Sequence, residues 1–239
     1  MRRALSLLTL LALVGCTPPE DERIWDLRKH LESNTGNVER IIRYGSFEDG
    51  IEDLRNVLAD ASDEESYVFL PEENVWIESG REEDYASVMV EVGVIDRFLF
   101  SGDEVVVVHY HPLLDDVLER FASNVNEHYG GTLSADVVEG LAYLANGMPG
   151  LADFSTVFMS YSFAEVEEVD INFSGVVSSF YGWIRYTKAE DVVVNDIFEE
   201  SFYNSLYSYN LGLVDAWLEN PYQPWEFEDD NIRVTFHPY

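Results

Sequence analysis

The chain has 239 residues, of which 46% are hydrophobic and 14% aromatic, so it is long and apolar enough to bury one core. Its 14 Lys and Arg against 46 Asp and Glu give a formal charge of −32, and no basic patch could neutralise nucleic-acid phosphates. The acidic residues are spread along the whole chain, a device by which halophiles keep a surface solvated. We therefore expect a folded domain without a nucleic-acid partner, adapted to a saline habitat; a cationic partner is the alternative explanation of the charge.

The N-terminus is typical of a targeting segment. Two arginines precede an apolar run over residues 4–14, which is too short to span a membrane. The run leads into Leu13-Val14-Gly15-Cys16, which resembles a bacterial lipobox at all four positions.

The lipobox resemblance implies cleavage before Cys16 and lipidation of its thiol. Thr17, rather than aspartate, follows the cysteine, which under the usual sorting pattern implies the outer membrane of a bacterial cell envelope. Residues 1–15 would then be the signal peptide, residues 16–23 a lipidated tether and residues 24–239 the folded domain. Because Cys16 is the only cysteine, we expect neither a disulfide nor a cysteine nucleophile.

Helical and extended patterns are interspersed along the rest of the chain. Apolar residues at helical spacing predict helices over residues 24–33, 37–44, 47–61, 113–129, 135–146 and 197–218, with a short helical turn over 95–100. Runs of β-branched and aromatic residues predict strands over residues 67–70, 75–78, 87–94, 104–108, 154–163, 173–186 and 232–236. Residues 221–225 predict a turn. The pattern predicts one α+β domain in which helices surround a mixed β-sheet.

The predicted strand over residues 104–108 leads directly into His109-Tyr110-His111-Pro112. Side chains two apart on a strand share a face and lie about 7 Å apart along it. His109 and His111 therefore point the same way at the end of a rigid element, which suits two imidazoles that bind one metal ion. Ordinary strand residues are the alternative interpretation.

Several stretches of the chain resemble the JAMM (JAB/MPN) metalloprotease domain, most closely its bacterial RadC-like group. The family pattern is an upstream Glu, then His-x-His-Pro, then Ser-x-x-Asp. The matching stretches are residues 65–70, 75–80, 106–112 and 132–137, in a core of about residues 64–187. The resemblance implies a cytidine-deaminase-like layout of the α+β fold, and a zinc ion that hydrolyses peptide or isopeptide bonds in a peptide or protein substrate.

The same resemblance implies roles for individual residues. They are His109, His111 and Asp136 as zinc ligands, Glu65 as general base and Ser134 as oxyanion stabiliser. Ser134 and Asp136 are two positions apart, whereas the family's serine and aspartate are three apart, so Asp115 or Asp116 remains an alternative third ligand. The alternative function is a non-catalytic envelope lipoprotein that uses the fold for binding or scaffolding.

Overall fold

The structure is a computed structural model that describes residues 41–58, 61, 64–82, 103–190 and 200–239. The chain divides into two compact units, residues 1–36 and 37–239, and every described residue belongs to the second unit. The predicted targeting segment, Cys16 and the elements predicted over residues 24–33 and 87–100 lie outside the described residues.

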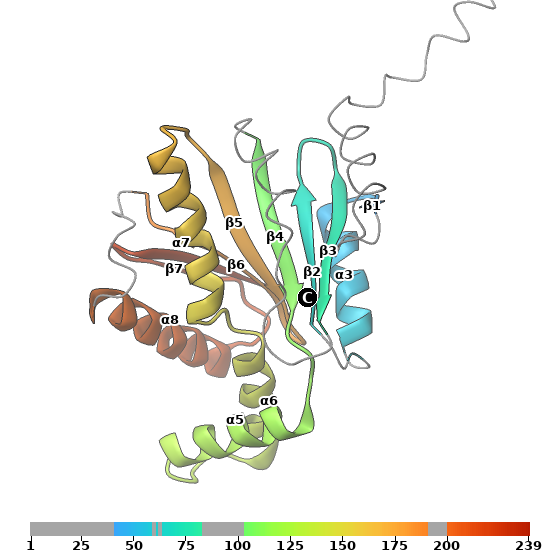
Figure 1. Cartoon of the computed structure of the whole chain (residues 1–239). Coiled ribbons are helices and arrows are strands. Elements are labelled where there is room, and N and C mark those ends of the chain that lie inside the picture. Colours follow the sequence, from blue (N-terminus) through green and yellow to red (C-terminus); the bar gives the residue numbers. More distant parts are fainter. Residues whose placement is uncertain (1–40, 59–60, 62–63, 83–102, 191–199) are drawn as a thin grey trace, which may run out of the picture. The chain divides into compact units, whose positions relative to one another are not determined.

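The described strands form one eight-stranded mixed sheet with the order β1-β3-β2-β4-β5-β6-β8-β7 (Figure 1). The strands are β1 (Ile41–Ile42), β2 (Glu64–Leu70), β3 (Val75–Glu82), β4 (Glu104–Tyr110), β5 (Asn172–Ser178), β6 (Gly182–Lys188), β7 (Trp225–Glu228) and β8 (Ile232–Pro238). In this sheet β4 and β5 run parallel, and each of the other neighbouring pairs is antiparallel. A parallel pair needs a long crossover connection, and three helices lie in the chain between β4 and β5.

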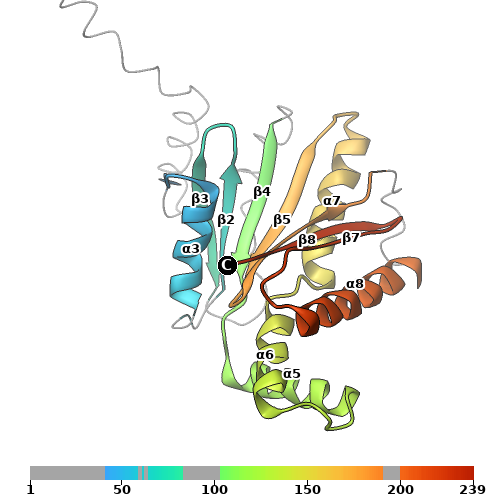
Figure 2. The ribbon, with the colours of Figure 1, turned by 180° about the vertical axis from the view of Figure 1, so that it is seen from behind.

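Helices cover both faces of the sheet, as the two opposite views show (Figures 1 and 2). The helices are α3 (Phe47–Leu58), α5 (Asp115–His128), α6 (Ala135–Asn146), α7 (Leu151–Val166) and α8 (Glu200–Glu219). Helix α3 packs on one face of the sheet, whereas α7 packs on β5 and β6 from the other and α8 on β7 and β8. None of them, among the described helices, is both long and apolar enough to cross a membrane.

The core has two apolar layers because side chains alternate between the faces of a strand. The layer under α3 is centred on Trp76, which is fully buried and stacks on Phe47 with ring centroids 5.4 Å apart. The layer under α7 is held by Phe154, whose ring lies 5.0 Å from that of Tyr186 on β6. Burying each such aromatic side chain contributes about 1.5–3 kcal/mol, so these two layers fix α3 and α7 on the sheet.

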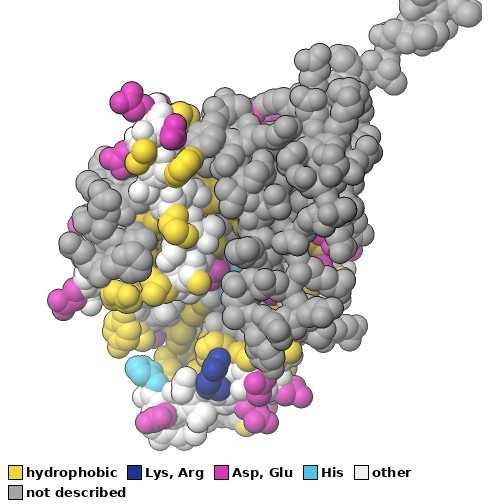
Figure 3. Space-filling view, viewed as in Figure 1, with side chains coloured by type: hydrophobic (Ala, Val, Ile, Leu, Met, Phe, Trp, Pro, Cys, Tyr) yellow, Lys and Arg dark blue, Asp and Glu magenta, His cyan; other side chains and the backbone are white. Residues whose placement is uncertain are grey.

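Helices α5 and α6 form a hairpin that interrupts the crossover. Gly130 and Gly131 join them with φ angles of 62° and 69°, a left-handed conformation that glycine adopts without strain. None of the 14 residues of α5 is buried, whereas α6 contacts the core. In the space-filling view the exposed surface of the hairpin carries several acidic side chains (Figure 3). The hairpin is therefore attached to the rest of the domain through α6. The C-terminal end of α6 leads through a short loop to α7.

Most of the elements predicted from the sequence are present, and the α+β class with a mixed sheet is confirmed. The prediction of a strand over residues 154–163 is wrong, because these residues belong to α7. The helix predicted over residues 37–44 is wrong where it can be compared, since Ile41–Ile42 pairs with β3 as a strand. The turn predicted over residues 221–225 leads into a strand, β7, that was not predicted from the sequence.

Candidate metal centre

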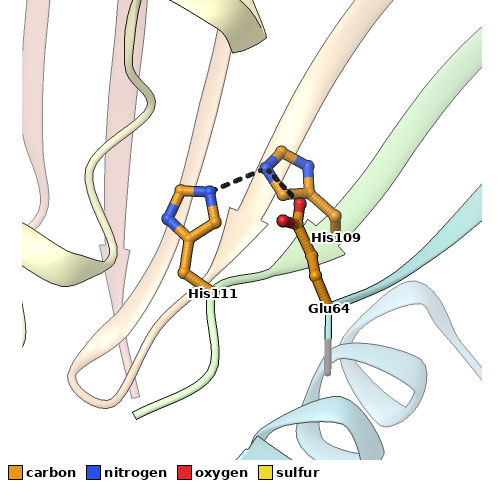
Figure 4. A group of neighbouring side chains, drawn as sticks. All are labelled: Glu64, His109 and His111. Atoms are coloured by element: carbon orange, nitrogen blue, oxygen red, sulfur yellow. Dashed lines mark hydrogen bonds and ion pairs between the residues drawn. The ribbon is translucent and has the colours of Figure 1, made fainter. Parts of the chain in front are cut away.

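The two histidines lie at the C-terminal end of strand β4, on the face of the sheet that α7 covers. His109 is 5% exposed and lies on the same face of the strand as Val105 and Val107. His111 follows directly after the strand, and its side chain is 25% exposed. The Nε2 atoms of His109 and His111 are 3.2 Å apart (Figure 4). The expectation that both imidazoles point the same way is met in this geometry.

The register between β2 and β4 brings Glu64 to the histidines. Ser66 pairs with His109 in this antiparallel ladder, so Glu64, two residues earlier on β2, shares the face of His109 and lies opposite residue 111. Glu64 Oε1 is 3.8 Å from His109 Nε2, and the Glu64 side chain is 12% exposed. Ligand atoms of Glu64, His109 and His111 all lie within 4.8 Å of one another, so this group could hold a metal ion (Figure 4).

A second carboxylate, that of Asp153, reaches the histidines from the first turn of α7. Its Oδ1 is 3.0 Å from His109 Nε2, and its Oδ2 is 3.9 Å from His111 Nε2. Oδ2 also accepts the backbone N–H of Gly150, the N-cap residue of α7, at 2.6 Å. This hydrogen bond fixes the carboxylate in place, and the helix N-terminus further favours its negative charge.

Asp153 and His109 shift each other's pKa. Burial alone would raise the pKa of Asp153, but the charges of His109 and His111 and the hydrogen bonds from His109 and Gly150 lower it to about 2. Burial alone would lower the pKa of His109, but the carboxylates of Asp153 and Glu64 outweigh this and raise it. The carboxylate of Asp153 is therefore ionised at neutral pH and attracts a cation.

His111 is oriented by the C-terminal residue of α6. Its Nδ1 lies 2.6 Å from the carbonyl oxygen of Asn146. A carbonyl only accepts hydrogen bonds, so Nδ1 carries a proton, and in the neutral form of the ring Nε2 is then the acceptor. In the metal-free centre, a proton on His109 Nε2 would then lie between Asp153 Oδ1 and the Nε2 atom of a neutral His111, which are 3.0 Å and 3.2 Å from His109 Nε2. A cation that replaced this proton would find both acceptors already aimed at it.

The structure places the other predicted site residues elsewhere. Glu65 lies on the opposite face of β2 from Glu64, where its carboxylate accepts the hydroxyl of Tyr67 at 2.7 Å. Ser134 is the exposed N-cap residue of α6, and Asp136 is exposed in the first turn of the same helix. Since Asn146 at the other end of α6 contacts His111, Asp136 lies about 15 Å further along the helix axis.

The two alternative third ligands, Asp115 and Asp116, are exposed in the first turn of α5. The carboxylates at the histidines are instead those of Glu64 and Asp153, neither of which was predicted from the sequence. A signal for Asp153 was present: Gly150-Leu151-Ala152-Asp153 has a spacing of three, and Gly150 marks the start of a helix. The wrong prediction of a strand from residue 154 concealed that helix start.

Comparison of the chain with models of protein families, with curated proteins and with solved structures gives no match.

Proposed function

We propose that this protein is a zinc-dependent hydrolase of peptide or isopeptide bonds, anchored to the bacterial cell envelope by a lipid on Cys16. The observation that carries the proposal is that His109 Nε2 lies 3.2 Å from His111 Nε2 and 3.0 Å from Asp153 Oδ1, while the other oxygen of the same carboxylate, Oδ2, lies 3.9 Å from His111 Nε2. Ligands that bind a tetrahedral zinc ion at about 2.0–2.1 Å lie about 3.3 Å from one another. The separations of 3.2 Å and 3.0 Å are close to this value.

The order of these residues along the chain also supports a JAMM-like centre. The family pattern is Glu, then His-x-His-Pro, then Ser-x-x-Asp, and the chain has Glu64, then His109-Tyr110-His111-Pro112, then Gly150-Leu151-Ala152-Asp153. The spacing of the last motif is that of the family, with glycine at the position of the serine. The helical hairpin of α5 and α6 is inserted between the second motif and the third.

Two imidazoles and one carboxylate would leave a fourth zinc position open, the mark of a catalytic rather than a structural site. Zinc held there would act as a Lewis acid on the scissile carbonyl and on the attacking water. Glu64, whose Oε1 lies 3.8 Å from His109 Nε2, would take the proton of that water as general base. The same carboxyl would then pass the proton to the leaving amine, while the C–N bond breaks and the new C–O bond remains in the product acid.

One residue of the centre favours the alternative function, a non-catalytic binding module. Gly150 has no hydroxyl with which to stabilise an oxyanion, whereas the family pattern has a serine at this position. A centre that binds metal but lacks this donor would be a slow hydrolase or a structural site. Metal binding and hydrolysis therefore need separate measurements.

The test of the metal centre is the zinc content of the purified full-length chain beside that of a His109→Ala/His111→Ala variant. His128→Ala is the matched control, because His128 is an exposed histidine at the end of α5. We expect about one zinc per chain in the wild type and the control, and none in the double variant. Absence of zinc from the wild type after zinc has been added back would refute the proposal.

Hydrolysis and anchoring have their own tests. A zinc-loaded wild type should cleave members of a pooled peptide library, detected by mass spectrometry, and the double variant should not. If the zinc-loaded wild type cleaves nothing, the binding-module alternative replaces the hydrolase. Cys16→Ser should move the protein from the membrane fraction to the soluble fraction; continued membrane association would contradict the lipid anchor.

A further inference from the structure

Asn146 contacts the segment after β4 through both its main chain and its side chain. Its carbonyl oxygen accepts the Nδ1 proton of His111 at 2.6 Å. Its side-chain amide donates to the carbonyl oxygen of His111 at 3.0 Å and lies 3.5 Å from that of Pro112. Asn146 is only 5% exposed, so its side of these hydrogen bonds is shielded from water. The main-chain carbonyl of each residue therefore accepts a hydrogen bond from the side chain of the other.

The carbonyl of Asn146 is available because of its place in α6. Asn146 is the last residue of the helix, and the last four carbonyls of a helix have no partner within it. They also carry the negative end of the helix dipole, which favours a donor such as an imidazole N–H. The end of α6 thus supplies a directed acceptor for His111.

The amide of Asn146 determines where this carbonyl lies. Without the amide, the hydrogen bond between the Asn146 carbonyl and the imidazole would be the remaining contact between these two residues. That bond alone would leave both the carbonyl and the imidazole free to turn together. The next residue, Gly147, packs so closely on Ser179 that a Cβ atom would collide with the serine side chain. The end of α6 is therefore held against the β5–β6 turn by Gly147 and against the histidine segment by Asn146.

We propose that Asn146 is a positioning residue that selects the Nδ1-protonated tautomer of His111 and thereby presents Nε2 to a metal ion. Partners that donate to or accept from the second nitrogen of a ligating histidine fix its tautomer, and their loss typically weakens metal binding about 10- to 100-fold. The part of this inference that concerns metal rests on the proposed function. The part that concerns the tautomer applies to the metal-free protein as well.

The test compares Asn146→Ala, Asn146→Asp and Leu144→Ala in the full chain. Asn146→Asp keeps the size of the side chain, but a carboxylate cannot donate to the carbonyl of His111. Leu144 is fully buried in the same helix, so Leu144→Ala destabilises the helix packing without removing this contact. The readouts are the tautomer of His111 in the metal-free protein, from ¹⁵N NMR of the imidazole at mildly alkaline pH, and the zinc dissociation constant from competition with a chelating dye.

We expect the wild type and Leu144→Ala to hold His111 in the Nδ1-protonated form. Both Asn146 variants should show a mixture of tautomers and bind zinc about 10- to 100-fold more weakly. A wild type with the proton on Nε2, unchanged tautomers in the Asn146 variants, or an equal change in Leu144→Ala would overturn the inference. If the wild type binds no zinc but the tautomer shifts in the Asn146 variants, the positioning role stands and the hydrolase proposal fails.

Discussion

His109 Nε2 lies 3.0 Å from Asp153 Oδ1, and this contact joins the end of β4 to the first turn of α7. The two residues are far apart in the sequence, with the whole α5–α6 hairpin between them. Their contact brings a carboxylate from beyond the hairpin to the histidines at the end of β4.

We expect Asp153→Asn to abolish or severely weaken zinc binding, because an amide cannot replace the anionic ligand. The dissociation constant should rise by more than the roughly 10- to 100-fold typical of residues that only support a ligand. Asp136→Asn is the matched control, since Asp136 is exposed in the first turn of α6. The measurement is zinc affinity by isothermal titration; an equal loss in the control would contradict the assignment of Asp153.

Glu64→Gln should keep zinc but lose hydrolysis, because glutamine cannot carry the proton from water to the leaving amine. The rate should fall about 10²- to 10⁴-fold, the usual contribution of general acid–base catalysis. Glu65→Gln should retain activity, since Glu65 lies on the opposite face of β2 against Tyr67. Rates would be measured on a peptide identified from the pooled library, and a larger loss in Glu65→Gln than in Glu64→Gln would show that the wrong glutamate has been chosen.

Gly150→Ser should increase hydrolysis if the missing hydroxyl limits the rate. Gly150 has an extended backbone with φ −98° and ψ −171°, which any residue can adopt. A Cβ at this position would lie 3.7 Å from Asp153 Oδ2, an ordinary contact, so the variant should fold normally. A well-placed oxyanion donor contributes about 10²- to 10³-fold, which sets the upper limit of the gain.

The control for this gain is Gly150→Ala, which adds the Cβ without the hydroxyl. It should match the wild type in both stability and rate. If Gly150→Ser is no faster than Gly150→Ala, the hydroxyl does not reach the reacting carbonyl, and oxyanion stabilisation at this centre must come from another group.

His237 should make stability depend on pH. Its ring stacks on Trp183 with centroids 3.8 Å apart, and burial together with Arg185 lowers its pKa, partly offset by Glu226 and Glu48. Between this lowered pKa and about 6.5 the unfolded chain binds more protons than the folded one, so the contribution of His237 to stability rises with pH through this window. Below the folded-state pKa, His237 is protonated in both states, and the folded state bears the full free-energy cost of burying its charge.

The measurement is the free energy of unfolding in urea between about pH 5 and 8 for the wild type and His237→Gln. The difference between the two curves isolates His237 from His109, whose raised pKa acts in the opposite sense. The advantage of the wild type should grow as pH rises to about 6.5 and then level off. A difference that is flat, or that shrinks with rising pH, would contradict the lowered pKa.

Gly147→Ala should destabilise the fold by about 1–3 kcal/mol, the usual cost of overpacking a well-filled site. Its new Cβ would collide with Ser179, which is 2% exposed and cannot move outward freely. Urea unfolding measures the loss, and Gly150→Ala, whose Cβ has room, is the control. Equal stability of Gly147→Ala and the wild type would show that α6 can shift at this end.

The histidines could be predicted from the sequence because the information is local. A valine run that ends in His109-Tyr110-His111 defines both the strand and the shared side, and the structure has both. The information that distinguishes Glu64 from Glu65 is not local in the sequence. A shift of one residue moves a side chain to the other face of a strand, and only the pairing of Ser66 with His109 decides which glutamate faces the centre.

Asp136 was expected as the third ligand, and Asp153 was not expected at the histidines, for a different reason. Phe154, Val157 and Phe158 favour strands by composition, yet their spacing buries all three when the segment is helical. Tertiary packing decided the element, and with it the helix start at which Asp153 lies. Asp136 also begins a helix, but on the hairpin, whose placement no local pattern could reveal.

Three segments of the chain meet at the centre, and their meeting bears on the stability of the fold. Residue 64, residues 109–111 and residue 153 belong to β2, to the end of β4 and to α7, so a shared ion would cross-link three distant parts of the chain. With one cysteine, the chain cannot form an internal disulfide that would close such loops. A bound ion would serve the same purpose, because it would remove loop entropy from the unfolded chain. Chelation would then act on this protein as reduction acts on a disulfide-bonded one.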